Sequence, residues 1–541
     1  MQKFCKFCQS APNQSWIGPG LYDFGKIFGF LFFLSPIVIQ LEKCFKENRM
    51  FRFKKLFLVF VATLVITGCS EVTELSITVQ SDQTVSVGSQ IQLESNLDVF
   101  WSSANPTIAS IDEQGMVQGI AEGVVAMRAT LKTDAEIFAT LEITVIPVEP
   151  IIPEPETVEV FLGIDRIDEN LSLFEGKRVG LITNQTGFNR DLVSTIDVLN
   201  EKVNLVALFA PEHGIRGDLQ AGSNVSSYVD EKTGITVYSL YGSTQKPTAE
   251  MMALIDVLCI DIQDAGARFY TYVYTMAYAM KACQEFGKQM VVFDRPNPAG
   301  GTNYEGNILD LAYSSFIGKY PIVQRHGMTI GELAGLFNTE YGIGCDLEVI
   351  LMEGWERDMY YDDTKLPWVV PSPNFPSVDT ALVYPGTCIF EGTNMSEGRG
   401  TTTPFQVTGA PFIDADKYAQ ALNDLELPGV TFRPAYFTPT FSKHANVLCN
   451  GVQVHVTDRE TFMAVKTGWA MLEVARTLFP NDVSILNGTQ DRCMLNLLTG
   501  NRYLNDRTYS LEEQFAILLQ DTAAFGVIRE NYLLYSSEIG E

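Results

Sequence analysis

The sequence predicts an α/β protein in which a doubly wound, mostly parallel β-sheet follows a small all-β domain. From about residue 158 onward, apolar runs of strand length alternate with segments long enough for helices. These runs are nearly continuous in Val, Ile and Leu, which is typical of strands buried on both faces. Between residues 72 and 145, apolar residues instead recur at every second position, which predicts half-buried strands. A length of 541 residues fits such a division into several domains.

The composition excludes some classes of function. The formal net charge of −27 argues against a broad basic face, so we predict no nucleic-acid partner. Apolar residues make up 46% of the chain, which is enough for sizeable cores and argues against a disordered protein.

Residues 50–69 have the pattern of a secretory signal peptide. A basic start is followed by eleven apolar residues, Leu56–Ile66, which are too few to span a bilayer as a mature helix. The segment Ile66-Thr67-Gly68-Cys69 resembles the lipobox of bacterial lipoproteins. The resemblance implies acylation of Cys69, membrane attachment through that lipid and, with Ser70 next, an outer-membrane location facing the periplasm. An ordinary secretory signal with a chance cysteine is the alternative.

The 49 residues that precede this signal are unexpected, because a signal peptide should begin a protein. We predict that Met50 is the true translation start and that residues 1–49 are a mis-assigned extension. The extension has its own apolar run, Ile27–Ile39, and a real additional membrane segment there is the alternative.

The all-β part has a recognisable sequence pattern. Its alternating segments include Leu75–Val79, Gln90–Leu93 and Leu141–Val145. The run Phe100–Asp112 followed by Gly115–Gly119 resembles the bacterial Ig-like group 2 domain. Residues 72–146 are therefore identified as such a domain, which implies a spacer or adhesive module without catalysis. We expect Trp101 to fill its core, with sugar stacking as the alternative.

A short linker separates this domain from the main one. Residues 147–157 alternate proline with Glu and Ile, a composition that favours an extended, semi-rigid chain. The strands predicted beyond it are Arg178–Thr183, Val203–Phe209, Thr236–Leu240, Val257–Asp261 and Met290–Asp294, with helices at Leu192–Glu201 and Tyr272–Phe286. Their order predicts a Rossmann-like sheet.

Unusual polar clusters follow four of these strands directly. They are Gly180–Gly187, Phe209–Gly217, Asp261–Tyr272 and Asp294–Gly301. Because the carboxyl ends of parallel strands form the ligand crevice of an open sheet, these clusters predict one shared site. Ordinary surface loops are the alternative.

Several cofactor classes have no support in the sequence. No Gly-x-Gly-x-x-Gly follows the first strand and no Gly-x-x-x-x-Gly-Lys-[Ser/Thr] occurs, so no nucleotide cofactor is predicted. Only four histidines are present, and Cys5-x-x-Cys8 has no second pair, so no metal site is predicted. The six cysteines after residue 200 are expected to be mostly buried thiols, with one disulfide left open.

The strand-end clusters belong to a longer series of motifs. The set "LFAPEHGIRGDLQAG", "DIQDAGARFYTYVYTM", "VFDRPNPAGG", "PIVQRHGMTIGELA" and "FPSVDTALVYPGTCIFEGTNMSEGRGTTTPFQ" resembles the exo-β-N-acetylmuramidase (NamZ) family over residues 158–541. The resemblance implies a Rossmann-like catalytic subdomain, residues 158–375, and a smaller α/β C-terminal subdomain, residues 376–541, with the active site between them. It also implies an exo-acting glycoside hydrolase that releases terminal N-acetylmuramic acid from peptidoglycan fragments in cell-wall turnover and recycling.

Glycoside hydrolysis needs a carboxylic acid and a second carboxylate. The resemblance points to Glu212 as the acid, and His213 could orient it; a structural ion pair of Glu212 with Arg216 is the alternative. For the second carboxylate we rank Glu305 first. The open alternatives are Asp261, Asp264, Glu391 and Glu397, of which Asp261 could instead be buried under Arg268. Retaining and inverting chemistry both stay open.

Muramic acid carries a lactyl carboxylate that a bidentate arginine would suit. We expect Arg268 or Arg399 to bind it, followed by Arg216 and Arg295. Aromatic rings for the sugar are offered by Tyr270, Tyr272 and Tyr274, with internal packing as their alternative. The remaining predicted substrate-binding residues are Gln263, Asp264, Asn297 and Glu397.

Two other functions compete with hydrolysis of a sugar. One is an envelope protein that binds muropeptides or other glycans without cleaving them. The other is an esterase or amidase, although no Gly-x-Ser-x-Gly motif supports it.

Overall fold

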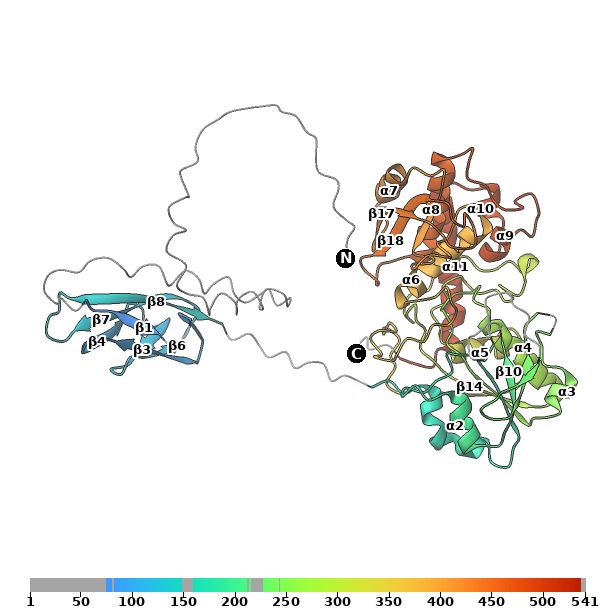
Figure 1. Ribbon diagram of the computed structural model, residues 1–541, viewed down its shortest axis with the longest axis horizontal. Helices are drawn as coiled ribbons and strands as arrows, with labels where there is room; N and C mark the ends of the chain where they lie inside the picture. The colour runs from blue at the N-terminus through green and yellow to red at the C-terminus, as the bar shows by residue number, and fades with distance from the viewer. Residues whose placement is uncertain are drawn as a thin grey trace, which may run out of the picture. The chain divides into compact units, whose positions relative to one another are not determined.

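The computed structural model describes residues 74–79, 82–147, 159–211, 214–215, 227–242 and 244–536. The chain divides into two compact units, Met1–Ile152 and Pro153–Glu541 (Figure 1). The predicted lipid site Cys69 and the segment Ile27–Ile39 lie outside the described residues, as do Glu212, His213 and Arg216. Within the described ranges, no helix is long and apolar enough to cross a membrane.

The first unit is a sandwich of two four-stranded sheets. One sheet has the order β1 (Ile77–Val79), β3 (Gln90–Ser95), β6 (Met116–Gly119), β5 (Ala109–Ile111); the other has β2 (Thr84–Ser86), β8 (Phe138–Ile146), β7 (Gly123–Leu131), β4 (Val99–Ser103). Alternate residues of these strands, such as Leu93, Met127 and Ile143, fill the core between the sheets. Trp101 is partly buried against this core, in agreement with the packing role expected for it.

A seven-stranded sheet organises the second unit. Its order is β11 (Tyr228–Val229), β12 (Thr236–Ser239), β10 (Leu205–Ala210), β9 (Val179–Thr183), β13 (Val257–Asp261), β14 (Gln289–Phe293), β15 (Asp346–Ile350). All neighbours are parallel except β11, an antiparallel edge strand. By position along the chain, the six parallel strands run third, second, first, fourth, fifth, sixth, which is the Rossmann order. The predicted doubly wound sheet is therefore confirmed.

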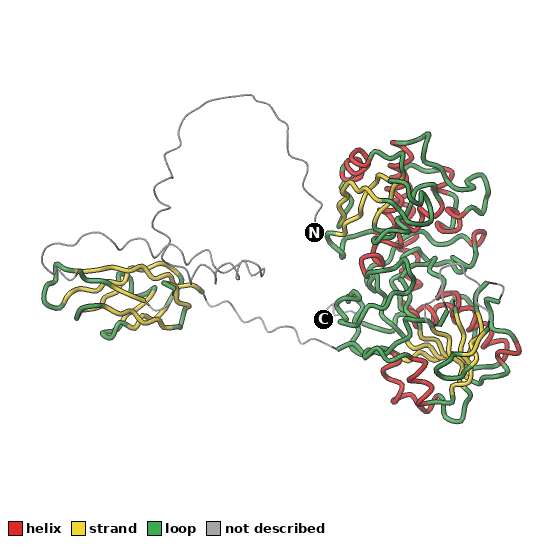
Figure 2. Tube along the Cα trace, in the orientation of Figure 1, coloured by secondary structure: helices red, strands yellow, loops and turns green. Residues whose placement is uncertain are grey.

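Helices cover both faces of this sheet (Figure 2). Because successive side chains of a strand point to opposite faces, Leu258 and Ile260 of β13 join the core beneath α4 (Tyr272–Phe286) and α5 (Ile330–Thr339). Val257 and Cys259 join the opposite core, with α2 (Thr195–Lys202) and the 3₁₀ helix η1 (Gly163–Leu173). The short helix α3 (Ala249–Met252) lies before β13.

The C-terminal part contains a three-stranded antiparallel sheet and a group of helices. The sheet order is β16 (Val407–Ala410), β18 (Cys449–Val456), β17 (Val430–Phe437). The helices are α6 (Val378–Thr387), η3 (Cys388–Gly392), α7 (Ala415–Asn423), α8 (Ala464–Leu478), α9 (Met494–Thr499), α10 (Tyr503–Asp506), α11 (Leu511–Arg529) and η4 (Glu530–Tyr532), and η2 (Leu311–Tyr313) precedes them in the chain.

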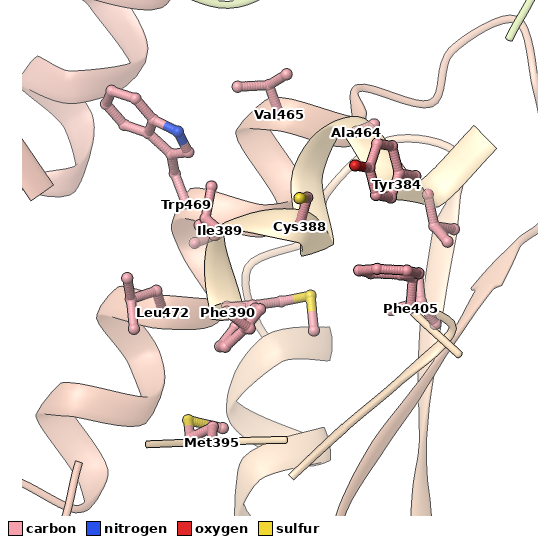
Figure 3. Packing of buried hydrophobic residues seen from close by; sticks show 14 of the residues in the cluster. Tyr384, Cys388, Ile389, Phe390, Met395, Phe405, Ala464, Val465, Trp469 and Leu472 are labelled. Carbon is pink, nitrogen blue, oxygen red and sulfur yellow. The ribbon is translucent and has the colours of Figure 1, made fainter. Parts of the chain in front are cut away.

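Helices α6 and α8 cross at very close range. A Cβ atom on Gly386 would lie 1.9 Å from the carbonyl oxygen of Ala464, so only glycine fits there. Around the crossing, Tyr384, Phe390 and Trp469 form part of one buried apolar cluster (Figure 3). This cluster is the core of the C-terminal part.

The end of the chain returns to the first subdomain. Figure 1 shows α11 running from the C-terminal part toward the parallel sheet, where Phe525 enters the core beneath α4. Arg529 donates to the carbonyl oxygens of Gly301 and Gly327, and the Tyr535 hydroxyl donates to Asp294 Oδ2 at 2.6 Å. The last residues of the chain therefore connect the C-terminal part to the first subdomain.

All six cysteines after residue 200 are free and buried. They are Cys259, Cys283, Cys345, Cys388, Cys449 and Cys493. The expectation of buried thiols is confirmed, and the disulfide left open among them does not form.

Candidate active site

The strand order fixes where a ligand crevice lies. From β9 the chain continues to β10 on one side of the sheet, and it later returns through β13 on the other side of β9. The loops that leave β9 and β13 therefore diverge, and such a switch point is where open α/β sheets bind their ligands. The loops are Asn184–Gly187 and Ile262–Gly266, two of the clusters singled out in the sequence. Glu212 follows β10, the other neighbour of β9.

A buried hydrogen-bond network joins these two loops. The Asn184 carboxamide oxygen accepts from the Thr186 amide at 2.9 Å and from its hydroxyl at 2.6 Å. The Thr186 hydroxyl oxygen in turn accepts from the Gln263 amide at 2.9 Å. The Gln263 Nε2 group donates to the carbonyl oxygen of Pro296 at 2.7 Å, so the loops after β9, β13 and β14 are connected.

Asp261 and Arg295 form a buried ion pair beneath this network. Arg295 Nε donates to Asp261 Oδ1 at 2.5 Å, and Arg295 Nη2 donates to Oδ2 at 2.8 Å. The Thr195 hydroxyl also donates to Oδ2. The alternative that Asp261 is covered by Arg268 is therefore wrong, because Arg295 fills that position.

Arg268 contacts backbone oxygens from three distant segments. Its guanidinium donates to the carbonyl groups of Asn307, Ile322, Leu498 and Thr499 at 2.7–3.0 Å. The side chain is fully buried, and burial lowers the pKa of Arg268 to about 10. These contacts stabilise the junction of the two subdomains, whereas binding of a lactyl carboxylate stays a prediction for this residue.

Glu305 lies at the start of α8. Its Oε2 atom accepts from the Lys466 amide at 3.3 Å, and its Oε1 atom lies 3.9 Å from Arg325 Nη1. Burial raises the pKa of Glu305, although Arg325 and the amides at the helix start act in the opposite direction. A carboxylate in this place stabilises the helix terminus. Its role as second catalytic carboxylate remains a prediction, with both oxygens directed to structural partners.

Asp264 differs from Asp261 and Glu305 because no described arginine or lysine pairs with it. Its Oδ2 atom accepts from the Gly266 amide at 2.8 Å and lies 3.4 Å from His326 Nε2. Because His326 Nδ1 accepts from the Met328 amide at 3.2 Å, the ring proton sits on Nε2 and faces Asp264. The buried Oδ1 atom has no hydrogen-bond partner within the described ranges. In the sequence, only its place in one of the quoted motifs distinguishes His326.

A second charged cluster lies in the C-terminal subdomain. Arg399 Nη2 pairs with Glu391 Oε1 at 2.5 Å, and Arg399 Nε lies 3.4 Å from Glu397 Oε1. Lys443 Nζ lies 2.8 Å from Glu397 Oε2. Both carboxylates are thus neutralised by cations, and Arg399 keeps a quarter of its side-chain surface exposed.

Aromatic rings connect this cluster to the start of α4. Tyr270 contacts Tyr272 edge-on at 5.1 Å and Tyr384 at 5.9 Å. Tyr384 contacts Phe405 at 4.8 Å, and the Arg399 guanidinium lies 5.1 Å from the Phe405 ring centre. The structure therefore brings Tyr270, Tyr272 and Arg399 together through two rings that the sequence did not single out.

The other predicted ligands make internal contacts. Tyr272 donates to the carbonyl oxygen of Pro371 at 2.9 Å. Tyr274 is fully buried and stacks on Phe337, and burial raises the pKa of its hydroxyl. Asn297 donates to the Met328 carbonyl at 3.0 Å and accepts from the Ala299 amide at 2.9 Å. The contacts of Tyr274 are therefore those of a residue that packs internally.

A surface groove borders the crevice and was missed in the sequence. It has a volume of about 460 Å³ and is lined by Gln185, Leu192, Pro367, Trp368, Val369, Val370 and Pro373. The segment 367–373 is rich in proline and carries no charge, so its composition is typical of a connection and gives no functional signal.

The fold and the site together define an enzyme-like α/β protein with two subdomains. A Rossmann-ordered sheet without a phosphate-binding glycine motif places carboxylates, guanidinium groups and aromatic rings around its switch point, a combination suited to an acidic sugar. Residues 179–379 and 382–535 match the models for the N-terminal and C-terminal domains of the exo-beta-N-acetylmuramidase NamZ. The chain belongs to this glycosidase family. Residues 70–138 match the bacterial Ig-like domain (group 2).

Individual relatives agree with this assignment. The peptidoglycan beta-N-acetylmuramidase NamZ of Bacillus subtilis (strain 168) is 52% identical over 384 residues, which cover 70% of this chain and 92% of that protein. A crystal structure of a DUF1343 family protein from Bacteroides fragilis is 39% identical, with a TM-score of 0.65, and covers 70% of this chain and 100% of its own. A second DUF1343 family protein from the same organism is 31% identical, with a TM-score of 0.56 and the same coverage.

Proposed function

We propose that this protein is an exo-acting glycoside hydrolase that releases terminal β-linked N-acetylmuramic acid from the non-reducing end of peptidoglycan fragments. The observation that carries the proposal is the 52% identity to the Bacillus subtilis β-N-acetylmuramidase, which extends through both catalytic subdomains. The switch-point crevice supports it, because its polar network is built from strand-end loops that belong to the matched region.

In this proposal Glu212 is the general acid. In the sequence it follows the last residue of β10 by two positions, and β10 is a neighbour of β9 in the sheet. The acid gives its proton to the glycosidic oxygen as the bond from C1 to that oxygen breaks. In an inverting reaction, the oxygen of a water molecule bonds to C1 and the proton that this water loses passes to the second carboxylate. In a retaining reaction, the second carboxylate first bonds to C1; water then displaces it, and its proton passes to Glu212, which the first step left as a carboxylate.

The geometry favours Asp264 as that second carboxylate. Asp261 is neutralised by Arg295, Glu305 contacts the start of α8, and Glu391 and Glu397 pair with cations. Buried oxygens of Glu305, Glu397 and Asp264 lack a hydrogen bond among the described residues, but those of Glu305 and Glu397 each face a cation. Asp264 Oδ1 has no such cation among the described ion pairs, and Asp264 follows β13 at the switch point. The Gly266 amide donates to its other oxygen, which also lies 3.4 Å from His326 Nε2.

The proposed substrate agrees with the proposed location. A lipid on Cys69 would hold the enzyme at the outer membrane facing the periplasm, where peptidoglycan fragments arise. The substitution Cys69→Ser should release the protein from membranes into the soluble fraction. Unchanged membrane association would assign the anchor to another segment.

One assay separates hydrolysis from binding alone. The purified protein would be incubated with a chromogenic β-N-acetylmuramide and with the matching β-N-acetylglucosaminide. We expect release from the first only, because the second lacks the lactyl carboxylate. Release from neither, combined with binding of muropeptides in calorimetry, would contradict the proposal and establish a glycan-binding protein.

A further inference from the structure

The groove beside the crevice has a rigid aromatic wall. Trp368 is half-buried, and its Nε1 group donates to the carbonyl oxygen of Phe375 at 3.4 Å. Its ring contacts Tyr361 edge-on at 4.9 Å and lies 6.4 Å from the Phe375 ring. Because the indole N–H is already engaged, the ring can offer a ligand only its apolar surface.

The backbone that carries this ring is held by the crevice itself. Gln185 Nε2, in the loop after β9, donates to the carbonyl oxygens of Val370 at 3.0 Å and Pro371 at 2.9 Å. The Tyr272 hydroxyl, at the start of α4, donates to the same Pro371 oxygen at 2.9 Å. The segment 367–373 is therefore fixed against two elements of the switch point.

The groove also adjoins the crevice. A small cavity, lined among others by Gln263 and Arg295, shares three wall residues with the groove, namely Leu192, Pro367 and Val369. Gln263 belongs to the buried network of the switch point, and its Oε1 atom has no hydrogen-bond partner among the residues that the structure describes. The groove therefore lies next to residues of the switch-point network.

The chemistry of the groove suits a neutral pyranose ring. Among the residues that the structure describes, its walls are Trp, Val, Leu and Pro side chains with a single carboxamide, Gln185, and no charged group. A volume of about 460 Å³ falls in the range of ligand sites, roughly 300–1,000 Å³. The C–H face of a sugar can stack on the indole, while the carboxamide can bind a hydroxyl or acetamido group.

We infer that this groove is the subsite for the second sugar of the substrate, the N-acetylglucosamine that leaves when the terminal muramic acid is removed. The inference rests on the proposed function, because an exo-acting enzyme must hold the terminal sugar at the reacting groups and lead the rest of the glycan outward. Trp368 is then a specificity-determining residue for glycan substrates, and it takes no part in the cleavage step.

The test compares two substrates that differ only beyond the cleaved bond. One is a disaccharide fragment in which muramic acid is linked to N-acetylglucosamine, and the other is methyl β-N-acetylmuramide, whose leaving group is too small to reach the groove. An aryl muramide is avoided, because its aromatic leaving group could itself stack on Trp368. Released muramic acid is measured by mass spectrometry.

We expect Trp368→Ala to lower kcat/KM about tenfold on the disaccharide, mostly through KM, and to leave the methyl glycoside within about twofold. Trp368→Phe should recover most of the loss. The matched control is Tyr436→Ala, an exposed aromatic on β17 that lies outside the groove. Equal losses on both substrates, or no loss on the disaccharide, would overturn the inference.

A failure of the proposed function gives a different result. In that case wild-type protein cleaves neither substrate, and the groove is tested through disaccharide binding by calorimetry. Weaker binding by Trp368→Ala than by wild type and Tyr436→Ala supports the subsite, and equal binding by all three overturns it. Thermal unfolding of each variant shows that the fold is retained.

Discussion

Five carboxylates near the predicted site have distinct surroundings, and these decide what each can do. Asp261, Glu391 and Glu397 face cations, so their charge is already balanced. Glu305 accepts from a helix start and its other oxygen faces Arg325, whereas Asp264 Oδ1 has neither a hydrogen bond nor a cation among the described contacts. Residue type and spacing could not rank these groups, because the ranking depends on partners supplied by other segments.

The substitution Glu212→Gln removes the proposed acid while keeping the size of the side chain. We expect kcat to fall by roughly 10²–10⁴, the contribution typical of a positioned general acid. Binding of muramic acid should change little, because the amide can still contact the sugar. Steady-state kinetics and calorimetry measure the two effects, and near-full activity would remove Glu212 from this role.

The substitution Asp264→Asn tests the second carboxylate. We expect kcat to fall by about 10²–10⁴ with little change in stability, because the Gly266 contact can be kept. Glu305→Gln is the matched control, and it should destabilise the fold by about 1–3 kcal/mol with a smaller effect on kcat. If the two variants behaved in the reverse manner, the catalytic role would return to Glu305.

The close packing of helices α6 and α8 depends on glycine at their contact. The backbones of the two helices meet at Gly386 and Gly468, and a Cβ atom on either would lie about 2 Å from backbone atoms of the other helix. Such close approach packs Tyr384 and Trp469 into one core and places the N-terminus of α8 against Glu305. The position of the α8 N-terminus beside Glu305 therefore depends on the glycine contact between α6 and α8.

The substitution Gly386→Ala should force these helices apart and destabilise the protein by about 1–3 kcal/mol, the usual cost of overpacking. Gly335→Ala, in α5, is the control, because its nearest neighbour would be 4.0 Å away. That control should be neutral or more stable, since alanine favours the helix. Chemical denaturation measures the free energy of unfolding of both variants. Equal effects would show that the α6–α8 contact does not require glycine.

The elements also show what a sequence can predict. The predicted helix Tyr272–Phe286 has the observed bounds, because Gly287 ends it with a φ of 63°. Strand β15 was missed, since Asp346 and Glu348 interrupt its apolar pattern. The four strand-end clusters were found, yet the partners of Arg268 lie up to 231 positions away in the sequence, and no local pattern specifies such contacts.

At the scale of the whole molecule, the chain end completes the first subdomain. Tyr535 contacts Asp294 at the end of β14, and Leu534 donates from its amide to Glu332, which also pairs with Arg357. Burial raises the pKa of Asp294 to about 6, although the hydroxyls of Tyr535 and Thr329 act in the opposite direction. The buried carboxyl group of Asp294 thus links the end of β14 to the C-terminal tail.

This acid predicts a pH dependence of stability. The folded state holds the Asp294 proton more tightly than the unfolded state, whose pKa is near 3.8. The free energy of unfolding should therefore fall as the pH rises from about 4 to about 6, by up to roughly 3 kcal/mol from this group. Above that window its contribution is constant. In Asp294→Asn this decline should be shallower in urea titrations, and an unchanged pH profile would contradict the prediction.

The return of α11 and the tail also has a consequence for the order of folding. A ribosome completes the parallel sheet of residues 179–350 long before it adds Phe525, Arg529 and Tyr535. Until those last residues arrive, the core beneath α4 is incomplete and the carbonyl groups of Gly301 and Gly327 lack their hydrogen bonds from Arg529. The catalytic unit should consequently mature late, after synthesis is finished, whereas the sandwich ahead of it can fold while the rest is still being made.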